Sequence, residues 1–402
     1  MSRRAERGFA AAAFLSLTLV LSAVASAETV DPPLVLEAKI PLGEVNGRID
    51  HLGVDLNRRR LFVAELGNNT LGVVDLAAGR TTHTIGGFSE PQGVAHVPFA
   101  DNVYVANGGD GSVRVMRGED LAPSGRIDLG GDADHVRVDF QHQRVLVGYG
   151  KGALAIIDPA SRTKTGDIRL KAHPEGFQID DVGARVFVNV PDAHEIAVAD
   201  LAAPGANASW PTQGLRSNFP MALDRDAYRV LVVFRSPPAL IAFAAEDGSP
   251  AAKLETCGDA DDVFVDAKRH RVYVSCGEGV VDILGQDGTG YRRIARVPTV
   301  AGARTSLFVP ELDRLFVAVR AGSGERPSIW VFRPTPRTRW ERSPRLLGRR
   351  CSLAGAAPRG VIVLSMVPTQ RSPRRVRSKS SWVRSNIFAT APIACCSLPI
   401  TG

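Results

Sequence analysis

Residues Asp134-His-Val-Arg-Val-Asp139, Val145-Leu-Val-Gly148 and Leu154–Asp158 are three short apolar stretches separated by turn-like sequence. Valine, leucine and isoleucine predominate in them, and no segment of helical period comes between them. Such runs, bounded by polar turn residues, predict three consecutive antiparallel strands. The same pattern occurs seven times along the chain, and this repetition is the strongest guide to the fold.

Each repeat begins with a short stretch that ends in Asp or Pro. These first stretches are residues 50–55, 93–98, 134–139, 175–180, 219–224, 261–266 and 305–310. Their last residues are 43, 41, 41, 44, 42 and 44 positions apart. The second strands are expected at 61–64, 103–106, 145–148, 186–189, 230–233, 272–275 and 315–318. The third strands are expected at 71–75, 113–116, 154–158, 196–200, 240–243, 280–284 and 329–332.

Four short strands in a repeat of about 42 residues are typical of a β-propeller blade. Repeats one to six are followed by an edge segment, such as Thr82–Ile85 or Gly125–Leu129, whereas the seventh ends at Phe332 with three strands. An unassigned strand, Leu34–Leu42, precedes the first repeat and could supply the missing edge. We therefore predict an all-β, seven-bladed β-propeller over residues 28–333, closed by an N-terminal strand donated to the last blade. An open β-solenoid or a pair of sandwiches is the alternative.

The first 27 residues resemble a secretory signal peptide. Arg3, Arg4 and Arg7 precede an apolar run from residue 9 to 24, and Ala25-Ser-Ala27 has the small residues of a cleavage site. We expect cleavage before Glu28 and a periplasmic or secreted mature protein without a transmembrane segment. An uncleaved membrane anchor is the alternative, although the apolar run is near the lower limit for a span.

Charge is distributed unevenly along the 402 residues. Residues 334–402 contain thirteen Lys and Arg and one acid, Glu341, whereas residues 28–333 contain 33 basic and 40 acidic residues. The formal net charge of +7 therefore hides an acidic middle region. We predict that 334–402 is a basic, disordered C-terminal extension, with a nucleic-acid or anionic-lipid arm as the alternative. Nucleic acid is not the expected partner of the propeller itself.

Two sequence motifs resemble a known family. Val103-Tyr-Val-Ala-Asn107 followed by Gly108-Gly-Asp-Gly-Ser-Val113, together with Glu90-Pro-Gln-Gly-Val94, resemble the YVTN-repeat β-propellers, which are exported seven-bladed bacterial proteins. The resemblance covers about residues 34–333 and implies a propeller fold. Family members include proposed binding and scaffold proteins, and the similar lactonase propellers are enzymes, so the resemblance leaves function open.

The loops before the first strands of a propeller meet on one face around the central channel. The residues at these positions are unusually ionic, which predicts a ligand-binding mouth. We assign to this mouth Arg48, Asp50, His51, Gln92, Asp134, His135, Glu175, Asn218, Asp261, Asp262 and Arg304. Two imidazoles among carboxylates can bind a divalent metal or a cationic ligand, with His51 and His135 as candidate metal ligands.

The same residues also allow a purely structural interpretation. Asp before an inner strand can accept backbone N–H groups, and His can pack between blades. Adjacent residues of a strand point to opposite faces, so Asp50 and His51 are not expected to face the channel together if both are in the strand. The loops after the second strands could rim the same mouth, through Glu65, Asn107, Tyr149, Lys151, Asn189, Asp192, His194, Arg235, Glu278 and Arg320.

Known catalytic motifs are absent from the sequence. There is no haem-attachment motif, no H-E-x-x-H motif, no G-x-S-x-G elbow and no glycine-rich loop that opens a helix. Cys257 and Cys276 lie at the two ends of a predicted hairpin, which favours a disulfide in an exported protein. The other three cysteines, Cys351, Cys395 and Cys396, show no pattern.

The leading hypothesis is a non-catalytic binding or scaffold protein. Its mouth would take a small ligand, a divalent metal ion or a partner protein; no other cofactor is indicated. The alternatives are a metal-dependent, lactonase-like hydrolase and a nucleic-acid-binding protein that uses the basic extension. The natural ligand and the oligomeric state are not encoded in any motif of the sequence.

Overall fold

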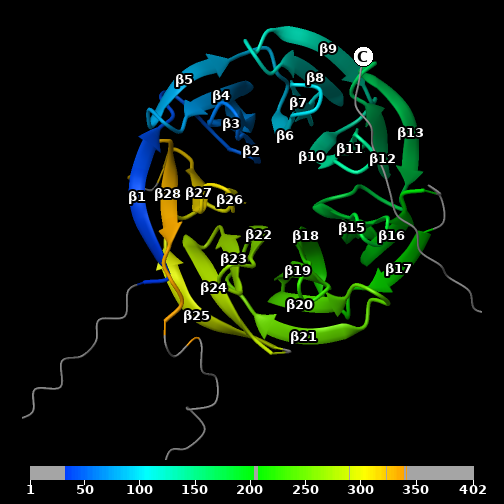
Figure 1. Cartoon of the computed structure of the whole chain (residues 1–402), viewed down its shortest axis with the longest axis vertical. Helices are drawn as coiled ribbons and strands as arrows, with labels where there is room; N and C mark the ends of the chain where they lie inside the picture. The colour runs from blue at the N-terminus through cyan, green and yellow to red at the C-terminus, as the bar shows by residue number, and fades with distance from the viewer. Residues whose placement is uncertain (1–31, 203–206, 289, 323, 339–340, 342–402) are drawn as a thin grey trace, which may run out of the picture. The chain divides into compact units, whose positions relative to one another are not determined.

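Seven four-stranded antiparallel sheets are arranged around a central channel (Figure 1). The structure is a computed structural model that describes residues 32–202, 207–288, 290–322, 324–338 and 341. Residues 1–27, predicted as a signal peptide, and most of the predicted extension 334–402 lie outside the described residues. The predicted seven-bladed β-propeller is confirmed.

Each blade runs outward from the channel through four strands. The innermost strands are β2 (Leu52–Asp55), β6 (Pro91–Val97), β10 (Ala133–Asp139), β14 (Phe177–Asp180), β18 (Arg216–Asp224), β22 (Ala260–Asp266) and β26 (Ser306–Val309). The second strands are β3 (Arg60–Glu65), β7 (Asn102–Asn107), β11 (Arg144–Tyr149), β15 (Arg185–Val190), β19 (Arg229–Ser236), β23 (Arg271–Cys276) and β27 (Arg314–Val319). The third strands are β4 (Thr70–Asp75), β8 (Ser112–Arg117), β12 (Ala153–Asp158), β16 (Glu195–Asp200), β20 (Pro238–Ala244), β24 (Val280–Asp287) and β28 (Ser328–Pro334).

The outermost strands are β1 (Leu34–Pro41), β5 (Arg80–Ile85), β9 (Pro123–Asp128), β13 (Thr163–Arg169), β17 (Asn207–Pro211), β21 (Pro250–Glu255) and β25 (Gly290–Pro298). Two short 3-10 turns, η1 (Leu66–Asn68) and η2 (Pro191–Ala193), follow β3 and β15. Blades one to six are β2–β5, β6–β9, β10–β13, β14–β17, β18–β21 and β22–β25, in chain order.

The second and third strands form the core because they are covered on both faces by neighbouring blades. All six residues of β7 are buried, whereas most of the outer strand β5 is partly or fully exposed. One buried cluster combines Val115 of blade two with Val147 and Ile157 of blade three. The apolar residues therefore join blades to each other rather than forming a separate core in each blade.

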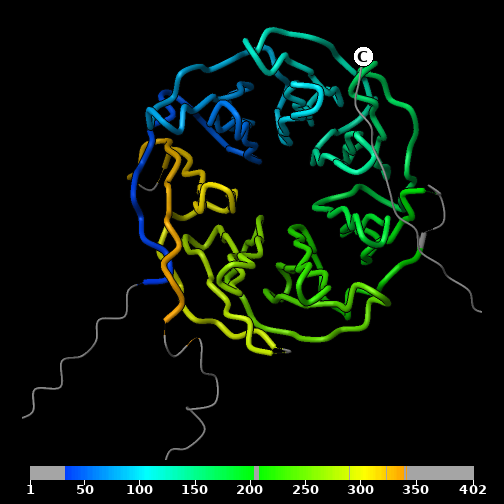
Figure 2. The backbone as a smooth tube through the Cα atoms, in the orientation of Figure 1, coloured from blue at the N-terminus to red at the C-terminus, as the bar shows by residue number. Residues whose placement is uncertain are grey.

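The ring closes through its N-terminal strand, as predicted. β1 pairs antiparallel with β28, with Leu34 opposite Pro334 and Pro41 opposite Ser328. The tube in Figure 2 shows the start and the end of the ring, blue and orange, running side by side at this seam. Blade seven thus has the sheet order β1-β28-β27-β26 and no unpaired third-strand edge.

The chain beyond β28 bonds to the propeller for several more residues. Thr335 N–H donates to the carbonyl of Pro33 at 3.0 Å. Arg271, 1% exposed, donates to the Thr335 carbonyl and to the buried carboxylate of Glu341. Thr335 and Glu341 thus make contacts that lie beyond the predicted domain boundary at residue 333.

Blade six contains the predicted disulfide, Cys257–Cys276, with a Cα–Cα distance of 6.0 Å. Cys257 lies just before β22 and Cys276 ends β23, and both side chains are buried. The bond fixes the loop that precedes the innermost strand of this blade. Among the described residues, no helix has the length and apolarity needed to cross a membrane.

Candidate functional site

The innermost strands carry β-bulges at their first residues. In β10 the register shifts between Ala133 and Val136, and β6 and β22 shift at the equivalent places. A bulge inserts one extra residue, so neighbouring side chains need not alternate between the two faces. Asp134 and His135 consequently both line the same cavity.

In blade one, β2 begins only at Leu52, so Asp50 and His51 precede the strand. Both line the cavity. The condition under which strand alternation would separate Asp50 from His51 is therefore not met, because neither residue lies in β2.

The cavity has a volume of about 540 Å³ and lies at the start of the innermost strands. It is lined by nine of the eleven predicted residues, namely Arg48, Asp50, His51, Gln92, Asp134, His135, Glu175, Asp261 and Arg304. Of the predicted rim residues, Arg235 alone is among its lining residues. The remaining lining residues are Leu66, Glu90, Gly108, Asp132, His173 and Phe219.

Two predicted residues, Asn218 and Asp262, do not line this cavity. Asn218 is fully buried and donates from Nδ2 to Asn189 Oδ1 and to the Glu195 carbonyl, which ties blade five to blade four. Asp262 follows the bulge of β22 and accepts the backbone N–H of Ser306 at 2.7 Å. It lines a second cavity of about 380 Å³ further along the channel.

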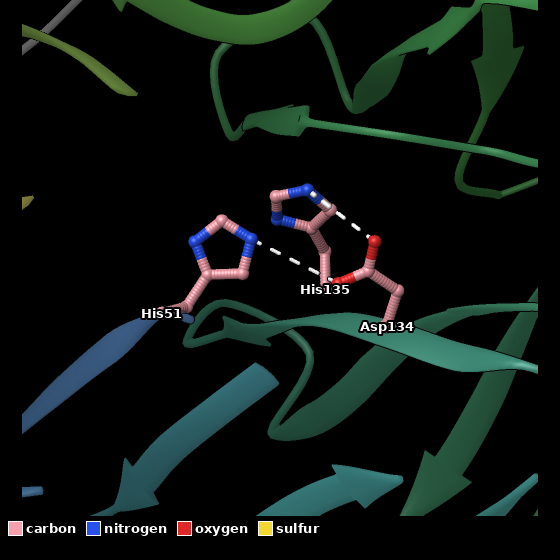
Figure 3. A group of neighbouring side chains, drawn as sticks. All are labelled: His51, Asp134 and His135. Atoms are coloured by element: carbon pink, nitrogen blue, oxygen red, sulfur yellow. Dashed lines mark ion pairs between the residues drawn. The ribbon is translucent and has the colours of Figure 1, made fainter. Parts of the chain in front are cut away.

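Figure 3 shows the centre of the first cavity, where His51, Asp134 and His135 converge. Asp134 Oδ1 lies 3.8 Å from His51 Nε2, and Asp134 Oδ2 lies 3.9 Å from His135 Nε2. The two imidazole rings are 4.1 Å apart between centroids. One ligand atom from each of the three residues falls within 4.8 Å of the others.

Asp134 and His135 are 6% and 5% exposed. Asp134 Oδ1 and His135 Nδ1 are buried and accept or donate no hydrogen bond within the described part of the chain. Buried polar atoms normally have partners, because an unsatisfied one costs about 1–3 kcal/mol. The two atoms therefore mark a place where a ligand could supply the missing interactions.

The opposite side of the cavity consists of arginine–carboxylate pairs. Arg304 Nε lies 3.0 Å from Asp261 Oδ2, and Arg235 donates to the other oxygen of Asp261. The Arg235 guanidinium also lies 4.1 Å from the ring centroid of Phe219. Arg48 pairs with Asp50 between the two sides.

His173 and Asp132 are site residues that the sequence analysis missed. His173 lies in the loop between β13 and β14, and its Nδ1 is 2.6 Å from the Gly150 carbonyl. Each of the two residues stands two positions before a predicted residue, as Arg48 stands two before Asp50. That spacing, repeated between blades, is the signal that could have identified them.

Burial controls the protonation of the cavity side that contains His51, Asp134, His135 and Glu175, called here the histidine side. Burial, followed by the charges of Glu175 and Asp50, raises the pKa of Asp134 well above its usual value. Burial and the nearby Asp261 raise the pKa of Glu175 to about 8. Burial lowers the pKa of His51, and that of His135 further, so both imidazoles are neutral at pH 7. Neutral imidazoles and protonated carboxyls can accept a metal ion with release of protons.

The comparisons with known proteins concern the fold alone. No protein-family model and no curated protein matches the chain. Kuenenia stuttgartiensis hydrazine synthase matches with a TM-score of 0.58 and 16% identity, over 68% of this chain and 94% of that one. A chain of the mitotic checkpoint complex gives 0.64 and 13%, over 81% and 99%. The RRP9 WD40 repeats give 0.62 and 11%, over 75% and 98%. This chain is similar to all three in its β-propeller fold.

Proposed function

We propose that the protein is an exported binding protein that holds a divalent transition-metal ion in the mouth of its propeller. His51, Asp134 and His135 would be the protein ligands. The observation that carries this proposal is the convergence of three metal-binding side chains, two of which have a buried polar atom without a partner, Asp134 Oδ1 and His135 Nδ1. The comparisons add only that propellers of this kind commonly bind partners.

The ligand types indicate the class of metal. Two imidazoles and one carboxylate suit Zn²⁺ and neighbouring transition metals, whereas Mg²⁺ and Ca²⁺ prefer oxygen ligands alone. Ligands of one zinc ion at about 2.1 Å are about 3.4 Å apart, and one ligand atom from each of the three residues lies within 4.8 Å of the others, so zinc would draw the three side chains together. Three protein ligands leave a coordination position open toward the cavity, where a small ligand can bind.

We further propose that the chain is a YVTN-repeat protein of the periplasm or the extracellular medium. The resembling motif Val103–Val113 forms the hairpin of β7 and β8, where a family defined by strand and turn residues has its signature. The buried Cys257–Cys276 disulfide supports an oxidising compartment, since structural disulfides are rare in the cytosol.

Metal binding is tested by calorimetry and by elemental analysis of dialysed protein. We expect Zn²⁺ to bind the wild-type chain and His135→Ala to lose at least tenfold in affinity. His83→Ala is the matched control, because His83 is exposed on the outer strand β5. Absence of zinc binding, or equal affinity in His135→Ala, would show that these histidines only pack the channel.

A metal-dependent hydrolase of the lactonase type is the second candidate. The open metal position facing a cavity of about 540 Å³ favours it, because catalytic zinc sites also keep one position free. Hydrolysis of lactones and esters by the zinc-loaded protein, lost in His135→Ala and kept in His83→Ala, would support catalysis. Zinc binding without turnover would leave the binding function alone.

A further inference from the structure

A second group of potential ligands adjoins the first and shares one residue with it. Asp134, His173 and Glu175 each offer a ligand atom within 4.8 Å of the other two. Asp134 is the one residue common to this triad and to the triad of His51 and His135. His135 Nε2 and Glu175 Oε2 lie 4.0 Å apart and connect the two groups.

His173 is oriented as metal-binding histidines usually are. Its Nδ1 lies 2.6 Å from the Gly150 carbonyl oxygen, which can only accept, so Nδ1 carries the proton. In the neutral imidazole Nε2 then presents its lone pair, and it lies 3.9 Å from Asp132 Oδ2 at the cavity wall. A backbone carbonyl that fixes the tautomer in this way is the usual support of a metal-bound imidazole.

Asp134 has a carboxylate oxygen without a hydrogen-bond partner, which a carboxylate that bridges two metal ions needs. Its Oδ1 is buried without a hydrogen bond, and its Oδ2 lies 3.9 Å from His135 Nε2. A carboxylate whose two oxygens both face potential ligand groups can bind one cation with each. Two cations held in this way would lie about 3.5–4 Å apart, as in other two-metal sites.

The lining also contains more carboxyl groups than guanidinium groups. Three guanidinium groups, Arg48, Arg235 and Arg304, face six carboxyl groups, Asp50, Glu90, Asp132, Asp134, Glu175 and Asp261. Low-dielectric walls strengthen the attraction for a second cation.

From this geometry we infer that the cavity binds a pair of divalent cations bridged by Asp134. The first is bound by His51 and His135, and the second by His173 and Glu175. The inference rests on the proposed metal-binding function and adds a second position and a bridge. It identifies His173 and Glu175 as ligands.

The number of bound ions tests the inference. Elemental analysis and native mass spectrometry of zinc-loaded protein are expected to give two ions per chain. His173→Gln is expected to bind one ion, Asp134→Asn none with micromolar affinity, and His83→Ala two. Glu175→Gln gives a second probe of the same position if His173→Gln fails to fold, which far-ultraviolet circular dichroism would reveal.

The outcomes separate this inference from the proposed function. One zinc ion in the wild type, unchanged in His173→Gln, overturns the second position and leaves the first intact. No zinc in the wild type overturns both. Loading with Mn²⁺ tests the bridge, because two ions on one carboxylate give a spin-coupled electron paramagnetic resonance spectrum. Two ions with uncoupled spectra would overturn the bridging role of Asp134.

Discussion

The two sides of the cavity contain similar charged residues, but the polar atoms have partners on one side and lack them on the other. On the side of blades five to seven, Arg235 and Arg304 engage both oxygens of Asp261. On the side of blades one, three and four, Asp134 Oδ1 and His135 Nδ1 have no hydrogen-bond partner in the described chain. The charged groups of the first side have partners without a ligand, whereas the second side has buried polar atoms without partners. The comparison therefore separates the residues that hold the ring together from those that are available for binding.

The largest loss of stability is expected from a substitution on the arginine side of the cavity. Arg235→Met would leave Asp261, which is mostly buried, with Arg304 as its remaining close partner. Removing one member of a buried ion pair costs about 3–5 kcal/mol, and we expect about 3 kcal/mol because Arg304 remains. The midpoint of urea unfolding measures this loss.

Arg225→Met is the matched control in the same blade. Arg225 pairs with Asp181 on the surface, where both side chains are about half exposed. Such pairs contribute about 0–1 kcal/mol, so the variant should unfold close to the wild type. Equal destabilisation by the two substitutions would contradict the distinction between the two sides.

On the histidine side, by contrast, a bound metal should raise the free energy of unfolding. If zinc binds only the folded chain, its presence at one hundred times its dissociation constant adds about 2.7 kcal/mol to the free energy of unfolding. Urea unfolding with zinc and with a chelator measures the difference. His135→Ala should unfold like the wild type in chelator and gain little from zinc, whereas His83→Ala should gain the full amount. A zinc effect that survives in His135→Ala would place the metal elsewhere.

The fold could be predicted from the sequence because its signal is repeated seven times. The stretch Asp134–Asp139 predicted an inner strand, and β10 spans Ala133–Asp139. Leu34–Leu42 was the one strand left over, which predicted the closing edge found in β1. Register and burial in a propeller follow from the hydrophobic pattern, and this pattern is conspicuous in the valine-rich second and third strands.

Which individual side chains point into the cavity could not be predicted in the same way. A bulge such as that between Ala133 and Val136 leaves the apolar pattern of the strand intact, yet it turns two consecutive side chains into one cavity. The bulge in β22 separates Asp261, which reaches the cavity, from Asp262, which bonds to Ser306. His173 lies in a loop, where no periodicity indicates which way a side chain points.

The smallest expected effect concerns protons on the histidine side in the absence of metal. The pKa of Glu175 is raised to about 8 in the folded chain, mainly by burial, from an ordinary value of 4.5. Between these values the folded state holds a proton that the unfolded state has released. Raising the pH therefore favours unfolding, and the contribution of Glu175 to stability falls until the pH exceeds about 8. The lowered pKa of His51 and of His135 acts in the other direction only below about 6.5, so above neutrality only the carboxyls with a raised pKa contribute, and substitution of Glu175 separates its share from that of Asp134.

Urea unfolding of chelator-treated protein at pH 7.0 and pH 8.5 measures this effect. We expect the wild type to lose about 1 kcal/mol over this interval, within the limit of about 1.4 kcal/mol per pH unit for one proton. Glu175→Gln carries no titrating group at this position, so its stability should change less over the same interval. On the arginine side, Arg235→Met removes a charge that lowers the pKa of Glu175, so this variant should be less stable at both values and should lose its Glu175 contribution at higher pH than the wild type. A wild type whose stability is constant or rises from pH 7.0 to 8.5 would show that Glu175 is already ionised in the folded chain. In that case the histidine side would hold its negative charge without a metal, and its contrast with the arginine side would be one of geometry alone.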